Sequence, residues 1–566
     1  MQPCLPQKDS QPNQESRKAW LEKNRKRYEF NAQYLPPLTV IQDVPINESF
    51  SPTYLSERIP ATLTKLSANT LAVQVRSLWD PLDELQDFED FYPAMPSPSV
   101  MRSYQTDESF AEQRLSGCNP MVLKNIQALP PAFSYSLSEV QAAYGPNINL
   151  EQKLQEGHLY VADYTSLSFI QGGTYLKGKK YFPAPIALFA WRSAGYGDRG
   201  QLMPVAIQIA PQLGKDSGLV TPFSPANNWL YAKICVQIAD ANYHEMASHL
   251  CHTHLVMEPF AIVTARRLSP NHPLAILLRP HFRFMLFNNE LARKRLVSQG
   301  GIVDDLLAGT LRESLQIVQE SYFKNAQDCW SLDQAALPTA IKNRGLDDQD
   351  RLPHYPYRDD GQLLWEAIAA YVTNYLKLYY TTPEDWLEDY ELQAWAAELA
   401  DQSDAGGKVK GVPAQITTLD ELISIITAVI YTCSAQHSSV NFTQYDYMGF
   451  IPNAPLAAYQ PIKSKFEMDV NTNGEKELSL SELMAFLPPS SQVVDQIHVM
   501  YTLGAYRYDR LGYYDEPFSD RRAQIILSKF QQELNVIEHK IDIRNKKRVF
   551  PYEVLKPSLV INSISI

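Results

Sequence analysis

Histidines are concentrated in one stretch of this chain. Six of the eleven fall between residues 244 and 281, where an even distribution would place roughly one. Neutral imidazole is the nitrogen ligand most often used by zinc, iron, copper and nickel in proteins. Any one histidine alone is more often a core or surface residue, but this density predicts a transition-metal site. The six are His244, His249, His252, His254, His272 and His281.

The spacing of these histidines constrains the backbone that carries them. Four residues separate His244 from His249, and four separate His249 from His254. A step of five residues on an α-helix turns a side chain by about 140° beyond a full turn, so the histidines would diverge. They can meet at one metal only if the helix widens into a π-bulge, a feature that marks functional sites. The zinc-protease motif is excluded, because it needs two histidines at positions i and i+4.

A second polar pair lies near the end of another helical segment. His437 and Asn441 are four residues apart and share one face of an α-helix. Thr418 and Glu421 form a capping-box pattern that predicts the start of this helix at Leu419. Burying polar groups on an apolar face is costly unless they have partners, and a metal would be such a partner. The stripe predicted for this helix contains Ile423, Ile426, Ile430, Cys433, His437 and Asn441.

The elements that must position these residues are mostly helices. A helical pattern extends from Asn228 to Met257, and Pro259 predicts its end. Further helices are predicted over 290–297, 304–324, 362–380, 383–401 and 518–547. Strands are predicted over 158–164, 181–192 and 202–210. Residues 173–180 nearly match a phosphate-binding loop, but Lys180 replaces the required Ser or Thr and a strand follows, so a hairpin is predicted there.

Composition excludes some classes of partner and compartment. A net charge of −12 argues against nucleic acid, because phosphate binding needs a basic surface. The six cysteines lie far apart and predict free thiols in a reducing compartment. No signal peptide or membrane span is evident, so a cytoplasmic protein is expected.

The first hundred residues have a different character. Residues 1–14 are expected to be disordered, and a helix over 16–34 combines basic residues with Trp20, Tyr28 and Phe30. Such a helix can lie on an anionic membrane as a peripheral contact, and packing on the protein body is the alternative. Residues 35–100 are proline-rich and mixed, without a run of alternating strands.

These motifs together resemble the signature of the lipoxygenase family. The resemblance extends from about Arg102 to Ile566. It rests first on the histidine run and the segments around it, which are Trp229…Lys233, Met257-Glu258-Pro259-Phe260, Leu268…Pro273 and Leu278…His281. Three further segments also match, Phe110-Ala111-Glu112, Gly117…Pro120 and His437…Tyr445. The carboxyl end, Asn562…Ile566, resembles that of the family as well. It implies a mainly α fold, with long helices around a π-bulged metal-binding helix and a small antiparallel β subdomain. Residues 101–566 are expected to form the catalytic domain and residues 1–100 an N-terminal extension. This organisation resembles a short bacterial-type member without the N-terminal β-barrel lipid-binding domain.

The resemblance also implies a ligand set for one non-haem iron, cycling between Fe2+ and Fe3+. Three imidazoles, an amide oxygen and a carboxylate leave one position open for water. His244, His272 and His281 match positions outside the metal, and His252 is expected at the surface. Gln444 is implied to support the amide ligand. The implied ligands are His249, His254, His437, Asn441 and the terminal carboxylate of Ile566.

Family positions further imply a substrate channel. Leu296 matches the bulky residue beside the reactive carbon, and Ala292 the small-residue position where alanine tends to accompany S products. Val303 is expected to line the oxygen side. Glu245 and Leu250 stand where many plant members have glutamine and tryptophan. For each of these five residues, ordinary core packing is the alternative.

The activity implied by the family is insertion of dioxygen into polyunsaturated fatty acids that carry a cis,cis-1,4-pentadiene, such as linoleate or linolenate, to give lipid hydroperoxides. No side chain is expected to act as acid or base, because iron-bound hydroxide removes the hydrogen in this family. Isomerisation or cleavage of hydroperoxides on the same fold is one alternative. A lipid-binding scaffold with an inert metal site is another, and the intact ligand set argues against it.

Overall fold

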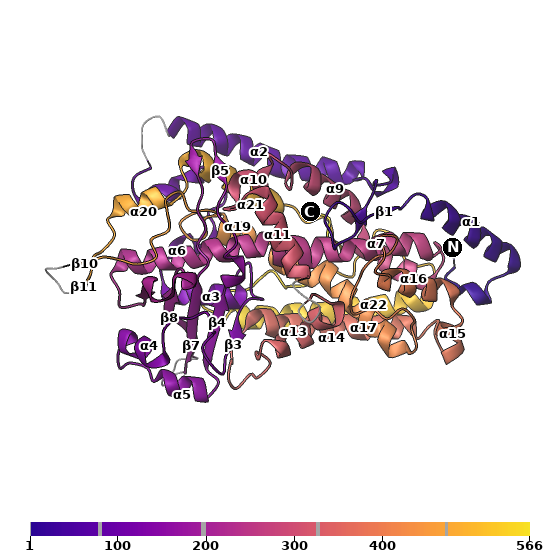
Figure 1. Cartoon of the computed structure of the whole chain (residues 1–566). Coiled ribbons are helices and arrows are strands. Elements are labelled where there is room, and N and C mark those ends of the chain that lie inside the picture. The colour runs from indigo at the N-terminus through magenta and orange to yellow at the C-terminus, as the bar shows by residue number, and fades with distance from the viewer. Residues whose placement is uncertain (1, 77–81, 194–199, 324–328, 470–473) are drawn as a thin grey trace.

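The computed structural model describes residues 2–76, 82–193, 200–323, 329–469 and 474–566. A long helical rod forms its axis and runs through the middle of the molecule (Figure 1). The rod consists of α6 (Ala226–Tyr243), a first π segment (His244–Leu255) and α7 (Val256–Arg267). Residues 228–242 of α6 are all buried, so this helix is surrounded by protein on every side.

The predicted end of the rod before Pro259 is wrong, because α7 continues through Pro259 to Arg267. A proline lacks the amide hydrogen that would bond a carbonyl one turn earlier. The carbonyl deprived of this bond is that of Leu255, four residues before the proline, and the side-chain nitrogen of Asn289 donates to the neighbouring His254 carbonyl at 3.1 Å. The rod therefore passes the proline with one backbone hydrogen bond fewer than a regular helix.

A second interrupted helix packs beside the rod. It consists of α17 (Leu419–Tyr431), a second π segment (Thr432–Gln436) and α18 (His437–Asn441). The capping box of Thr418 and Glu421 is confirmed. The continuous α-helical stripe predicted from Ile423 to Asn441 is wrong, because the second π segment changes the register before His437.

A five-stranded antiparallel sheet with the order β3-β4-β7-β8-β9 covers one end of the rod. Side chains of β4 alternate between two apolar clusters, with Tyr160 and Ala162 facing the main core and Leu159 and Val161 facing a smaller one. The predicted strands and the hairpin are confirmed, with shorter bounds. The strands are β3 (Lys124–Asn125), β4 (Leu159–Asp163), β7 (Ile186–Arg192), β8 (Gln201–Gln208) and β9 (Leu219–Val220), and the hairpin is β5 (Thr174–Tyr175) with β6 (Gly178–Lys179).

The other helices surround the rod and the second interrupted helix. The stretches predicted as single helices over 304–324 and 383–401 are each divided in two, and the others differ only in their ends. The bounds are α3 (Asp107–Ser116), α4 (Leu137–Tyr144), α5 (Leu150–Gln155), α8 (Pro273–Leu278), α9 (Met285–Arg295), α10 (Ile302–Leu306), α11 (Leu311–Tyr322), α12 (Leu332–Ala335), α13 (Leu337–Asn343), α14 (Pro356–Leu376), α15 (Pro383–Leu387), α16 (Tyr390–Ala400), α19 (Gln444–Met448), α20 (Leu480–Phe486), α21 (Ser490–Gly504) and α22 (Arg521–Asn545).

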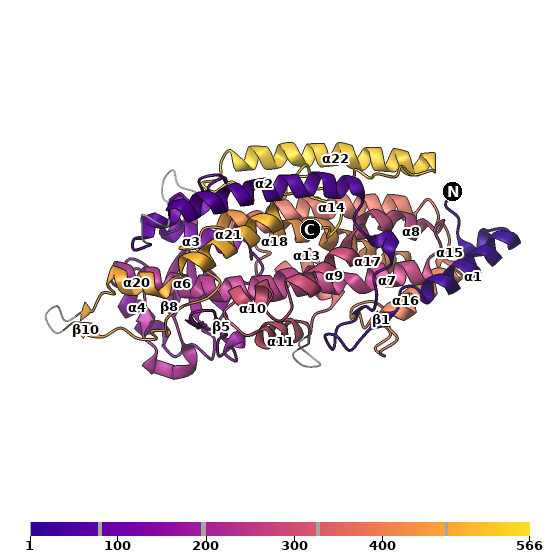
Figure 2. The ribbon, with the colours of Figure 1, turned by 90° about the horizontal axis from the view of Figure 1, so that it is seen from above.

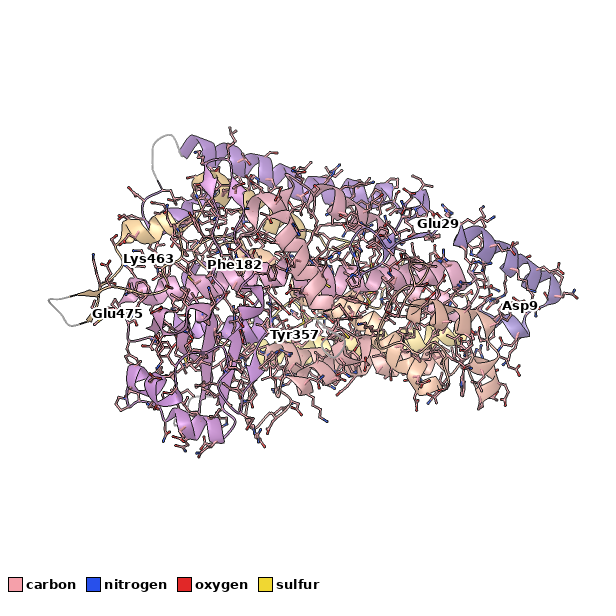
Figure 3. The ribbon with its side chains drawn as sticks, in the orientation of Figure 1. Asp9, Glu29, Phe182, Tyr357, Lys463 and Glu475 are labelled. Carbon is pink, nitrogen blue, oxygen red and sulfur yellow. The ribbon has the colours of Figure 1, made fainter. Side chains whose placement is uncertain are left out.

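The amino-terminal segment differs from its prediction. Helix α1 covers Gln11–Arg25 rather than 16–34, because the chain turns inward to bury Tyr28, whose hydroxyl donates to Glu48 at 2.5 Å. The residues before it, expected to be disordered, pack on the body through buried Leu5 and a bond from the Cys4 amide to the Asn271 carbonyl. Figure 3 shows Asp9 at this end of the molecule.

Residues 35–100 contain a long helix that the sequence pattern did not predict, α2 (Pro52–Arg76). It buries Tyr54, Thr62, Asn69 and Val73 along one face. Figure 2 shows it lying along the molecule, and it contacts α21. Two short strand pairs complete the fold, β1 (Phe30–Asn31) with β2 (Val40–Ile41) and β10 (Met468–Asp469) with β11 (Gly474–Glu475).

Within the described ranges, no helix is both long and apolar enough to span a membrane.

Candidate metal centre

Three histidines from the two interrupted helices converge at the centre of the molecule. Each of His249, His254 and His437 offers one ring nitrogen, and these nitrogens lie within 4.8 Å of one another. The Nε2 atoms of His249 and His254 are 3.2 Å apart. All three side chains are buried. Such a triad of converging imidazoles is a ready set of ligands for a transition metal.

The π segments bring these histidines together. At the end of the first one, the Val256 amide bonds the Cys251 carbonyl, a five-residue step. In each segment a hydroxyl bonds the carbonyl four residues earlier, where an α-helical amide would donate. Thr253 bonds the His249 carbonyl and Ser434 bonds the Ile430 carbonyl, both at 2.6 Å. The widened turn lets histidines five residues apart face the same point.

The protonation of the triad suits metal binding. Burial, assisted by the neighbouring His249, lowers the pKa of His254 to about 3. Burial also lowers the pKa of His437 well below its usual value. Neither of the two ring nitrogens of His437 has a hydrogen-bond partner among the described residues. Two buried, unpartnered nitrogens on one neutral imidazole are costly in an apolar core. A metal ion bound by one of them would relieve that cost, so the residues fit such an ion.

A buried network orients His254. Its Nδ1 donates to the amide oxygen of Asn289 at 2.8 Å, which leaves Nε2 facing the other two histidines. The Asn289 nitrogen also donates to Glu258 at 2.8 Å, and Arg293 pairs with the same carboxylate at 2.7 Å. The other oxygen of Glu258 accepts from the Ile41 amide at 2.8 Å. This network joins the rod, α9 and the amino-terminal segment around one imidazole.

Asn441 lies on α18 one turn after His437 and is fully buried. Its amide nitrogen donates to the Leu503 carbonyl at 2.7 Å, which fixes the orientation of the amide. The Gln444 nitrogen donates to the side-chain oxygen of Asn441 at 3.1 Å and to its carbonyl at 3.0 Å. Gln444 therefore contacts both oxygens of Asn441.

The carboxy-terminal tail enters the interior. Residues 560–566 are all buried, with Ile566 3% exposed, and the C-terminus lies in the middle of the molecule in both views (Figures 1 and 2). The Ile561 amide donates to the Ser438 hydroxyl, next to His437, at 3.3 Å. A buried terminal carboxylate needs a cation or hydrogen-bond donors to offset its loss of hydration. The tail thus brings a candidate anionic ligand toward α18.

Comparison with known proteins gives this site its context. A family model described as Lipoxygenase matches residues 62–553. The chain is 34% identical over 502 residues to linoleate 9/13-lipoxygenase of Pseudomonas aeruginosa, covering 86% of this chain and 70% of that protein. The chain belongs to the lipoxygenase family. It is also 31% identical over 552 residues to the allene oxide synthase-lipoxygenase protein of Plexaura homomalla, covering 93% of this chain and 50% of that protein.

Solved structures agree with this membership. An anaerobic structure of the delta413-417:GS LOX in complex with arachidonate superimposes with a TM-score of 0.89 at 30% identity and covers 100% of this chain and 84% of that one. Coral 8R-lipoxygenase gives a TM-score of 0.89 at 29% identity, with 100% and 83% coverage. The chain is therefore a lipoxygenase-type dioxygenase, and its mainly α fold with a π-helical rod is that of the family.

The other four histidines between residues 244 and 281 of this lipoxygenase have structural contacts. His244 lies beside the triad and bonds the Val440 carbonyl at 2.9 Å. His272 caps α8 and contacts Asp389 at 3.0 Å, and His281 bonds the Asn562 carbonyl at 2.9 Å. His252, expected at the surface, is only partly exposed, and its ring bonds the Ser321 carbonyl at 3.1 Å. That expectation was wrong because α11 packs against the first π segment.

The predicted channel residues form two groups. The first group contains Ala292, Leu296 and Val303, which are linked by backbone hydrogen bonds. The Leu296 amide donates to the Ala292 carbonyl at 2.8 Å, and the Val303 amide donates to the Leu296 carbonyl at 3.0 Å. Glu245 and Leu250 lie on the first π segment with His249 and His254, and all five side chains are partly exposed. Glu245 lies 3.7 Å from the His249 Nδ1.

Sequence reasoning missed the residues that orient the ligands. Asn289, Glu258 and Arg293 are ordinary helical residues without a diagnostic spacing, and only the packing of α9 against the rod brings them to His254.

Proposed function

We propose that this lipoxygenase inserts dioxygen into polyunsaturated fatty acids that carry a cis,cis-1,4-pentadiene and releases lipid hydroperoxides. The observation that carries the proposal is the buried, neutral triad of His249, His254 and His437, in a chain similar to proteins named linoleate 9/13-lipoxygenase and polyunsaturated fatty acid lipoxygenase. Fatty acid and dioxygen combine in this reaction without a third reactant. One C–H bond breaks, one C–O bond forms, and the hydrogen ends on the peroxide.

We further propose that one non-haem iron binds here and supplies the one-electron redox chemistry for removing the hydrogen atom. The residues that would hold it are His249, His254, His437, Asn441 and the Ile566 carboxylate. This donor set of imidazoles and oxygens suits iron. No side-chain acid or base is needed. The protein instead orients the ligands, through Asn289 and Gln444, and surrounds the site with apolar residues that keep water from the substrate radical.

The proposed channel contains Leu250 and Glu245 on the first π segment, and Ala292, Leu296 and Val303 on and after α9. Four of these five side chains are apolar, as an acyl chain requires. Residues 101–566 would form the catalytic domain, and residues 1–100 an extension packed on it through α1 and α2.

The test combines iron analysis with activity. Iron-loaded protein mixed with linoleate, with a hydroperoxide activator present, should consume oxygen and form conjugated diene in equal amounts. His437→Ala should lose most of the bound iron and both signals. Iron-loaded protein that consumes no oxygen and forms no diene would contradict the proposal.

A second activity is favoured by one observation. The chain is 31% identical over 495 residues to the human hydroperoxide isomerase ALOXE3. Consumption of a fatty acid hydroperoxide without oxygen uptake would assign that chemistry to this chain instead.

We also propose a peripheral membrane contact through α1. Lys18 and Lys23 on this helix and Lys26 directly after it are exposed, with Trp20 43% exposed. Sedimentation with phosphatidylserine vesicles should exceed that with phosphatidylcholine vesicles, and charge reversal at the three lysines should remove the difference. Equal sedimentation with both would reject this contact.

A further inference from the structure

Helix α2 contacts the very end of the chain. Tyr54 is completely buried, and its hydroxyl donates to the Ser565 carbonyl at 2.6 Å. That carbonyl belongs to the peptide bond that joins Ser565 to Ile566, whose carboxylate is a proposed iron ligand. Among the described contacts, the other hydrogen bonds that join residues 562–566 to the rest of the chain lie further from its end. The His281 ring bonds the Asn562 carbonyl at 2.9 Å, and the Ser563 hydroxyl donates to the Arg283 carbonyl at 2.7 Å.

The Tyr54 hydroxyl is itself held by a charged donor. Nη1 of Arg58, one helical turn later on α2, donates to the Tyr54 oxygen at 2.7 Å. The guanidinium also lies 5.5 Å from the centres of the Phe50 and Tyr54 rings. A hydroxyl that accepts from a cation becomes a stronger donor, because the two hydrogen bonds polarise one another. Arg58 therefore strengthens the bond from Tyr54 to the tail.

An aromatic cluster fixes the Tyr54 ring. Phe50 stacks on it with centroids 4.4 Å apart, and Phe284, Tyr506 and Tyr508 surround it at 5.0, 5.5 and 5.4 Å. Phe284 follows Arg283, the residue that accepts from Ser563. Because packing restricts the ring on several sides, the hydroxyl meets the tail with little further loss of side-chain freedom.

We propose that Tyr54 is a positioning residue for the terminal carboxylate ligand. Its hydroxyl fixes the peptide bond before Ile566 and so limits where the carboxylate can lie. Helix α2 begins before residue 62, where the family match starts, yet through Tyr54 it becomes part of the metal centre. This inference rests on the proposed iron ligand set.

The test is iron affinity of the full-length protein, measured by competition with a chelator. Tyr54→Phe keeps the ring and removes the hydroxyl, and it should weaken iron binding about tenfold or more, as the loss of a partner that orients a ligand does. The electron paramagnetic resonance signal of the ferric protein should change as well, because the carboxylate becomes less constrained. Arg58→Met should weaken iron binding in the same direction but less.

Tyr506→Phe is the matched control. Its ring packs against Tyr54 and its hydroxyl also contacts α2, at Glu57, but not the tail. It should leave both iron affinity and the ferric signal unchanged. Wild-type affinity in Tyr54→Phe, or an equal loss in Tyr506→Phe, would overturn the inference. A wild-type protein that binds no iron would instead refute the proposed function.

Discussion

At the scale of single residues, Asn289 does three things at the candidate metal centre. Its amide oxygen can only accept, so the His254 Nδ1 must carry the hydrogen and Nε2 is left for a metal. Its amide nitrogen donates to the His254 carbonyl. The same nitrogen contacts Glu258, which pairs with Arg293. One side chain therefore sets the tautomer of His254 and links this residue to the neighbouring ion pair.

Asn289→Leu should lower iron affinity by about ten- to a hundredfold, since the tautomer and orientation of His254 are no longer fixed. It should also destabilise the protein by about 1–3 kcal/mol, because buried polar atoms lose their partner. Chelator competition and thermal unfolding measure the two effects. Asn374→Leu is the control, since that exposed amide bonds only the Ala370 carbonyl of its own helix among the described contacts. Equal iron affinity in both variants would contradict this role.

At the scale of elements, the two π segments show what the sequence could and could not predict. The five-residue spacing of His249 and His254 requires a widened helix if both face one metal, so the first segment was predictable. The second was not, because His437 and Asn441 are four residues apart and fit an α-helix. The Ser434 hydroxyl, which donates to the Ile430 carbonyl inside this segment, is a contact that no periodicity reveals. Helix α2 was missed because Pro60 interrupts an otherwise weak helical pattern.

A buried lysine, Lys180, contacts helix α10 next to the proposed channel. The Lys180 amine donates to the Asp304 and Asp305 carbonyls, both at 2.8 Å, and burial lowers its pKa to about 8. Between pH 8 and the ordinary lysine pKa, the unfolded chain holds this proton and the folded chain does not. The contribution of Lys180 to stability therefore rises with pH through that window, and its burial cost is fully present below pH 8.

Wild type should gain thermal stability relative to Lys180→Met as pH is raised from 7.5 to about 10. The control is Lys179→Met, whose exposed side chain is in water before and after unfolding. Its difference from wild type should stay constant over the same range. Unfolding temperatures measured at several pH values test this prediction. A difference between wild type and Lys180→Met that stays constant with pH would contradict the lowered pKa of Lys180.

At the scale of the whole molecule, the amino-terminal segment packs as part of the body. Arg17 is 3% exposed and donates to Asp9 at 2.9 Å and to Glu391 on α16 at 3.1 Å. Further along, the Ile41 amide reaches Glu258 in the network around His254. A basic helix predicted from the sequence alone suggests basic side chains that face solvent. Arg17 shows why that interpretation is incomplete, because its partner Glu391 lies hundreds of residues away in the sequence and approaches it only through tertiary packing.

If this packing depends on Arg17, Arg17→Met should release α1 locally without unfolding the rest. Removing one member of a buried ion pair costs about 3–5 kcal/mol, which corresponds to at least a hundredfold loss of amide protection in α1. Native-state hydrogen exchange should show this loss over residues 11–25, while α6 and α17 keep their protection. Lys18→Met, on the exposed face of the same helix, should leave exchange in α1 unchanged. Equal protection of α1 in Arg17→Met and Lys18→Met would mean that the other contacts of the segment, such as Leu5 and Tyr28, hold it without the ion pair.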